Sequence, residues 1–222
     1  MTFEGVDVEA RPEGLKDLER LGIPLVPATV LGERWVHGWN PKALAELVGV
    51  TYTEGSRLSP EALAQRLDLI LAAAQRALRQ VPPEHLEMRA PDRDRSVRQL
   101  GFHIFRLSAA FRDVREQGYF PEEWLLEEPP AAMNNGAAIA AYGETVRDRL
   151  AHWFRRPAWC DGSVSTYYGG QSAHELMERT TWHAAQHLRQ LYWFIGKMGV
   201  TPEAPLTDDD LKGLPFPSAV WS

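Results

Sequence analysis

Two histidines on one predicted helix are the residues of this chain best suited to chemistry. His183 and His187 are four positions apart, and four residues advance a helix by about 400° and roughly 6 Å. Their imidazole nitrogens can therefore converge on one point, as metal ligands must. Two histidines fill only half of a typical coordination sphere. We therefore expect a third ligand from elsewhere in the chain, and the candidate is His103.

Apolar residues at helical spacing predict the elements that would position these histidines. The four long stretches with this pattern are Pro60 to Gln80, Ser96 to Gln117, Ala137 to Phe154 and Ser172 to Met198. His103 lies on the apolar stripe of the second stretch with Leu100 and Ile104, so it should face the core. The pattern favours a mainly α fold with an up-down four-helix bundle. Such bundles build metal sites from side chains that project inward from different helices.

The alternative for each histidine is a structural role. An isolated histidine on an apolar helix face is more often a hydrogen-bonded core residue than a metal ligand. Three histidines on two helices favour the metal site, and three imidazoles leave positions open for water and substrate. His174 precedes His183 by nine residues and is half a turn out of phase. We expect it at the helix start or beside the site, not on the metal.

The connection before the fourth helix carries other polar and aromatic candidates. Tyr167 and Tyr168 lead directly into that helix and could line the mouth of the site or pack on the surface. Cys160 is the single cysteine of the chain and follows Trp159. No base can be assigned to it, so we expect it to serve in packing.

The first fifty residues follow a different pattern. After an apolar start, a helix is expected from Pro12 to Leu21, then strands from Leu25 to Leu31 and from Arg34 to Gly38, separated by Gly32-Glu33. Asn40 is the expected N-cap of a helix from Pro41 to Val48. The segment therefore reads β-α-β-β-α. The predicted organisation is this segment at 1–50, a linker at 51–59, the bundle at 60–199 and an extended tail at 200–222 that packs on the bundle.

Composition excludes some classes of function. The 222 residues carry a formal net charge of −6, which argues against a nucleic-acid partner, because such binding depends on clustered Lys and Arg. The chain shows no secretory signal pattern and no apolar run of about 18 residues. With one cysteine, it fits a reducing compartment. We expect a cytoplasmic protein without membrane contact.

Two segments of the chain resemble a known family. The segment from Asp94 to His103 and the segment from Glu178 to Leu191 resemble the second-helix and fourth-helix signatures of the DinB/YfiT-like bundle proteins, and the likeness covers residues 60–221. The resemblance implies that His103, His183 and His187 are metal ligands and that Gln190 is a polar neighbour. The family is typically dimeric, and its characterised members include transferases and isomerases that use low-molecular-weight thiols.

The N-terminal segment is similar to a glutaredoxin from its second strand onward. The likeness lies in Val26-Pro27, in the hairpin from Val30 to Val36 and in Gly38-Trp39-Asn40-Pro41. The CxxC turn is absent and no cysteine precedes Cys160, which excludes disulfide exchange by this segment. The resemblance implies that Val26, Pro27 and Asn40 could bind a thiol cosubstrate. The other interpretation is an add-on that covers an edge of the bundle or supports a dimer.

These observations together predict a metal-dependent enzyme, a thiol-dependent transferase or a hydrolase, that acts on a small molecule. Zinc or nickel suits three imidazole ligands, with iron and manganese as alternatives, and a low-molecular-weight thiol would be the cosubstrate. The resemblance implies a homodimer. The alternative is a non-catalytic dimeric metal-binding or stress-response protein whose metal is structural.

Overall fold

The computed structural model describes residues 3–8, 11–24, 26, 28–38, 40–51, 57–90, 94–216 and 220. The chain divides into two compact units, Met1–Gly55 and Ser56–Ser222. Its described part is mainly α-helical, with one sheet of two strands and one of three. No helix in these ranges is both long and apolar enough to cross a membrane.

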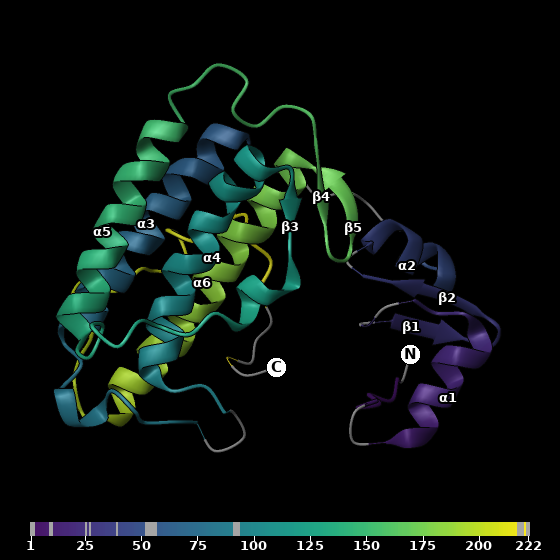
Figure 1. Ribbon diagram of the computed structural model, residues 1–222, viewed down its shortest axis with the longest axis horizontal. Coiled ribbons are helices and arrows are strands. Elements are labelled where there is room, and N and C mark those ends of the chain that lie inside the picture. The colour runs from purple at the N-terminus through teal and green to yellow at the C-terminus, as the bar shows by residue number, and fades with distance from the viewer. Residues whose placement is uncertain are drawn as a thin grey trace. The chain divides into compact units, whose positions relative to one another are not determined.

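The first unit contains two short helices and a hairpin. Its elements are α1 (Pro12–Leu21), β1 (Ala28–Leu31), β2 (Arg34–His37) and α2 (Pro41–Val48) (Figure 1). The strands pair antiparallel around Gly32, whose positive φ of 64° suits glycine in a tight turn. Asn40 caps α2 as expected, since its side chain accepts a hydrogen bond from the backbone N–H of Ala43. Among the described residues of the unit, Ile23, Ala45 and Leu47 are the buried apolar ones.

The predicted first strand of this unit is wrong, because residues 3–8 form no strand. In the described residues β1 and β2 pair only with each other, so a further strand would have no partner for its backbone groups. The segment turns into α1 instead, with the carbonyl of Asp7 accepting a hydrogen bond from the N–H of Arg11. Val6 and Val8 lie against the Cα position of Gly14 in α1. The described order is therefore α-β-β-α.

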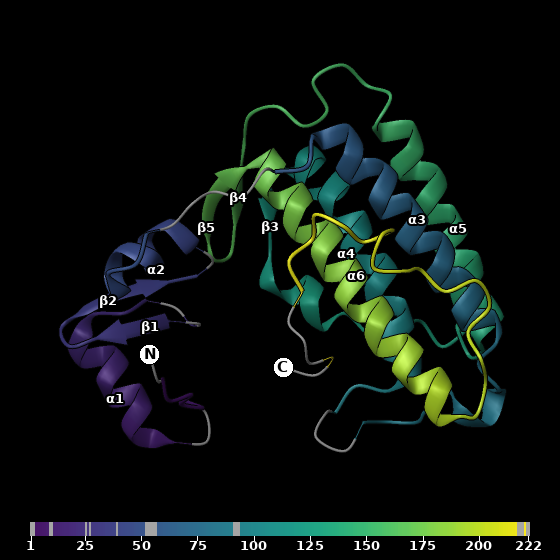
Figure 2. The same ribbon diagram turned by 180° about the vertical axis from the view of Figure 1, so that it is seen from behind.

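Four long helices make up most of the second unit (Figures 1 and 2). They are α3 (Pro60–Arg79), α4 (Val97–Gln117), α5 (Gly136–Trp153) and α6 (Ala173–Lys197). Each begins at a Ser or Asn whose side chain accepts a hydrogen bond from the third helical residue, which satisfies one of the free N–H groups of the first turn. Helices α3 and α4 each pack against both α5 and α6. Their shared core includes Leu67, Ile70, Phe105, Met177 and Phe194.

The directions of these helices differ from the predicted up-down order. Helix α5 runs antiparallel to α3, because Arg147, late in α5, pairs with Asp68 in the middle of α3, whereas Gly136, at the start of α5, lies against the carbonyl of Leu78 near the end of α3. Helix α4 also runs antiparallel to α3, since Gly101 in its first turns lies against Leu78. Two consecutive helices, α4 and α5, therefore run in the same direction. The prediction that each helix reverses the direction of the one before it is wrong.

The physical reason is the long connection between α4 and α5. Consecutive helices can be parallel only if the chain between them returns along their length. Residues 118–135 do this: Glu127 pairs with Arg106 in the middle of α4, and Glu128 accepts hydrogen bonds from the amide of Gln99 in its first turn. The segment includes a 3-10 turn at Glu122–Leu126, and another such turn, Pro83–His85, follows α3.

Helix α6 runs parallel to α3, and the chain after it folds back along both. His174 in the first turn of α6 contacts the carbonyl of Leu58, which precedes α3. Beyond α6, the carbonyl of Thr201 accepts a hydrogen bond from Gln80, just after α3. The tail then returns toward the start of α3, where Arg66 donates to the carbonyl of Asp209.

A small sheet, which the sequence pattern did not predict, precedes α6. It consists of β3 (Tyr119–Phe120), β4 (Ser163–Thr166) and β5 (Gly169–Ser172), with β4 parallel to β3 and antiparallel to β5. Strands of two to four residues are too short to show a period in the sequence. The sheet fixes the entry to α6, because Ser172 both ends β5 and caps the helix.

Candidate metal centre

The structure brings the three predicted histidines together. His103 comes from α4, and His183 and His187 come from consecutive turns of α6. One ring nitrogen of each lies within 4.8 Å of the others, and no further ligand joins this group in the described part of the chain. The Nε2 atoms of His183 and His187 are 3.0 Å apart. Each ring centroid of this pair lies 5.0 Å from that of His103.

The local sequence explains why these side chains meet. His103 is buried on α4 between the core residues Leu100 and Leu107. On α6 the fully buried stripe includes Ala184 and Leu188, and each follows one of the two histidines by a single position. This offset places the histidines at the edge of the apolar face of α6, where they are half-buried. The close packing of α4 on α6 then brings His103 to them.

The donor set fits a divalent transition metal. A metal–imidazole bond of about 2.0–2.1 Å lets one ion join two nitrogens up to about 4 Å apart. The His183 and His187 nitrogens, at 3.0 Å, meet this condition as they stand. All three donors lie within 4.8 Å of one another. The ring nitrogen of His103 would therefore need to move less than about 1 Å toward the other two to share one ion with them.

Burial keeps these histidines in the neutral form that can donate a lone pair to a metal. Burial, followed by the charges of His187 and Arg95, lowers the pKa of His103 to about 2. Burial also lowers the pKa of His187 to about 4, although its hydrogen bond to Gln190 opposes the shift. The pKa of His183 lies well below 6.5, mainly for the same reason. At neutral pH no proton has to leave before a metal can bind.

Gln190 orients His187. Its Oε1 lies 2.6 Å from Nδ1 of His187, so that nitrogen carries the proton and donates it to the amide oxygen. Nε2 of His187 then has a free lone pair and faces His183. The amide nitrogen of Gln190 lies 3.4 Å from the carbonyl oxygen of Val220, to which it donates. Hydrogen bonds of this kind fix the tautomer of metal-binding histidines.

Two arginines beside the centre were not predicted. Arg179 lies on α6 one turn before His183, and its charge contributes to the lowered pKa of that histidine. Its guanidinium carbon lies 3.9 Å from the ring centroid of Tyr168, and it donates a 3.4 Å hydrogen bond to the hydroxyl of Tyr167. Arg95 precedes the N-cap of α4, and its charge lowers the pKa of all three histidines. The four-residue spacing of Arg179 and His183 was the sequence signal that could have identified Arg179.

The remaining candidates lie outside the histidine cluster. His174 contacts the carbonyl of Leu58 with its Nε2 at 2.8 Å. Burial raises the pKa of Cys160 to about 11, which keeps it a thiol at neutral pH and argues against a nucleophilic role. In the first unit Val26 is exposed and the Asn40 side chain caps α2. Pro27 lies outside the described residues.

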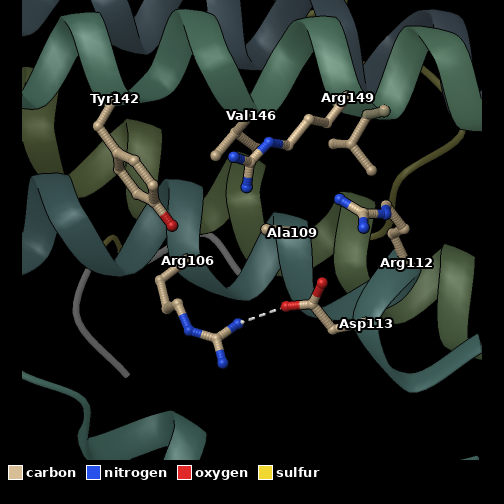
Figure 3. Close-up of a pocket in the computed structure, with 8 residues that line it drawn as sticks. Arg106, Ala109, Arg112, Asp113, Tyr142, Val146 and Arg149 are labelled. Carbon is tan, nitrogen blue, oxygen red and sulfur yellow. Dashed lines mark hydrogen bonds and ion pairs between the residues drawn. The ribbon is translucent and has the colours of Figure 1, made fainter. Parts of the chain in front are cut away.

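Two hollows on the second unit do not include the histidines. One, of about 70 Å³, lies between α4 and α5 and is lined by Arg106, Asp113 and Tyr142, among others. In Figure 3 the Arg106 side chain points to Asp113, with which it forms an ion pair of 3.2 Å. The other, of about 460 Å³, is mostly apolar and lies between α3 and α5, with Leu69 and Phe154 in its lining.

Comparison of the chain with models of known protein families finds no match, and comparison with curated protein sequences finds none either. The candidate function therefore depends on the geometry of the histidine cluster and its surroundings.

Proposed function

We propose that this protein is a metal-dependent enzyme whose divalent metal is held by His103, His183 and His187. The observation that supports this most directly is the convergence of three neutral imidazoles from two helices, with no fourth protein ligand among the described residues. Catalytic zinc sites commonly have three protein ligands and one open position, whereas structural sites have four. The histidine set therefore resembles a catalytic site more than a structural one.

The bound metal would act as a Lewis acid that lowers the pKa of a water or thiol bound to it. The protein side chains would contribute binding and orientation. The three histidines hold their lone pairs ready because burial keeps them neutral. Gln190 holds Nε2 of His187 toward the site. The positive charges of Arg95 and Arg179 would favour the deprotonated form of a bound nucleophile.

The reaction class that we propose is transfer of a small thiol or hydrolysis. A cluster of one histidine from α4 and a pair from α6 is what the resemblance to DinB-like four-helix bundles implied, and we propose that family, with its typical dimer, for this chain. Zinc and nickel are the metals that we expect, because imidazole ligands suit both.

Loss of the metal should abolish thiol transfer. The test is to mix the zinc-loaded or nickel-loaded protein with a panel of small thiols and a chromogenic electrophile and to measure the rate of thioether formation. The same panel without a thiol, but with an activated ester, tests hydrolysis. Chelator-treated protein and His183→Ala/His187→Ala should both fall to the uncatalysed rate. Equal rates in the loaded and metal-free proteins would contradict an enzymatic role for the metal.

The first unit is proposed to bind the thiol cosubstrate, through the region of Val26, Pro27 and Asn40. Because Met1–Gly55 is a compact unit of its own, a variant that lacks residues 1–50 should keep the histidine cluster. We expect this variant to bind the metal normally and the thiols more weakly, as measured by calorimetry. Equal thiol affinity in both proteins would show that the first unit does not contribute to thiol binding.

The second candidate is a non-catalytic protein with a structural metal. The observation that favours it is that neither described hollow is lined by a histidine of the cluster. This candidate predicts that metal raises the free energy of unfolding while no thiol, ester or other small molecule in the panel reacts.

A further inference from the structure

The surroundings of the three histidines are positively charged, although the whole chain is acidic. The formal net charge is −6, yet the charged side chains that lower the histidine pKa values are arginines. Arg95 acts on all three histidines and Arg179 on His183. A divalent metal on three neutral ligands would add two more positive charges, which an anion must balance.

Arg95 is half-buried and has no bonded partner among the described residues. Its side chain makes no hydrogen bond or ion pair to the residues that the structure describes, and burial lowers its pKa. The carboxylate that acts on it is Glu128, and both oxygens of Glu128 accept hydrogen bonds from the amide of Gln99. A guanidinium that loses water without gaining a partner is costly, unless a ligand supplies the missing acceptor.

Arg179 is held in place without being neutralised. The ring of Tyr168 lies under its guanidinium at 3.9 Å, and the hydroxyl of Tyr167 accepts its hydrogen bond. Neither tyrosine carries a charge at neutral pH. The nearby acidic residues of α6, Glu175 and Glu178, pair with Arg57 instead. Arg179 forms no ion pair with any part of the chain that is described.

We infer that the histidine cluster, together with Arg95 and Arg179, binds a small molecule that carries a carboxylate. The two guanidiniums supply the planar, multiple N–H donors that carboxylates accept, and the metal supplies the position for the reacting group. This inference rests on the proposed metal centre. It adds a substrate class, because neutral molecules of the same size would offer neither arginine an acidic partner.

Two probes of matched size test the inference: thioglycolate, which has a thiol and a carboxylate, and 2-mercaptoethanol, which has a thiol and a neutral hydroxyl. Calorimetric titration of the zinc-loaded protein should show thioglycolate binding about tenfold more tightly, the gain expected from one charge-assisted contact. Acetate, which lacks the thiol, should also bind, and acetamide should not. Thioglycolate and 2-mercaptoethanol binding with equal affinity would overturn the inference.

Variants test whether the arginines cause the preference for thioglycolate over 2-mercaptoethanol. Arg95→Gln and Arg179→Gln should each reduce the difference between the two thiols, and Arg95→Lys should keep part of it. Arg79→Gln, an exposed position at the end of α3, removes the same charge from the chain and should leave the difference unchanged. A tenfold preference that survives both Arg→Gln changes would refute the role of the arginines.

Metal content, measured on every variant, separates this inference from the proposed function. If the wild-type protein holds no metal, the proposed metal centre fails. If it holds metal and shows no preference for the carboxylate, the centre stands and the inference fails. Because the Arg95 side chain makes no hydrogen bond to the described residues, its replacement should leave the far-ultraviolet circular dichroism unchanged.

Discussion

The metal-free protein should lose much of its stability in mild acid, because the folded chain holds the buried His103 and the half-buried His183 and His187 in the neutral form. The reference pKa of histidine is 6.5, whereas that of folded His187 is about 4 and that of folded His103 about 2. As pH falls below 6.5, these histidines bind protons in the unfolded chain but stay neutral in the folded chain. The stability that these histidines contribute is therefore complete above pH 6.5 and is lost progressively down to the folded pKa.

The size of this loss follows from the two pKa values. Between pH 7 and pH 5, a histidine that titrates only in the unfolded chain changes the free energy of unfolding by about 2 kcal/mol. His103 and His187 together would remove about 4 kcal/mol, which is a large share of the roughly 5–15 kcal/mol of a typical domain, and His183, whose pKa is also lowered, adds to the loss. A metal present at 100 times its dissociation constant would raise the free energy of unfolding by about 2.7 kcal/mol at neutral pH.

The assay is urea unfolding of chelator-treated protein at pH 7 and pH 5, followed by far-ultraviolet circular dichroism. In His187→Gln the fall between the two pH values should be about 2 kcal/mol smaller than in the wild type, because one buried titrating group is gone. His152→Gln, at an exposed position on α5, controls for the loss of a histidine. The same pH dependence in His187→Gln and the wild type would refute the reasoning.

Two further changes test the support of the site and the packing of the helices. Gln190→Leu removes the acceptor from Nδ1 of His187 and should weaken metal binding about 10-fold to 100-fold in competition with a chelator; unchanged affinity would exclude the positioning role. Gly143→Ala places a Cβ 2.4 Å from Cζ of Phe105 and should lower the free energy of unfolding by about 1–3 kcal/mol. Gly196→Ala, where no atom lies within 4 Å of the added Cβ, should leave it unchanged or raise it, and equal effects of the two alanines would contradict the packing.

The helices of this protein were predictable because their sequence signals are local. Ser59-Pro60 and Ser96 mark helix starts by capping chemistry, and the apolar spacing runs through each helix. His103, His183 and His187 followed from the same periodicity, which identifies the face of each helix. The spacing within α6 brings two of the histidines together whatever the neighbouring helices do.

The features that were missed depend on contacts between distant residues. The direction of α5 depends on the return of residues 118–135 along α4, held by Glu127 and Arg106, and no local pattern reports it. The sheet before α6 has strands too short for periodicity. The role of Arg95 beside the cluster depends on its position relative to α6, which its own segment does not specify.

The central claim, a metal held by three histidines, is tested most directly by elemental analysis of protein purified without a histidine tag. Wild-type protein should carry about one divalent metal ion per chain, and His183→Ala/His187→Ala should carry little, because one imidazole alone cannot retain it. Circular dichroism of the variant must show that it is folded. Equal metal in the folded variant and the wild type, or no metal in the wild type after exposure to zinc or nickel, would contradict the account.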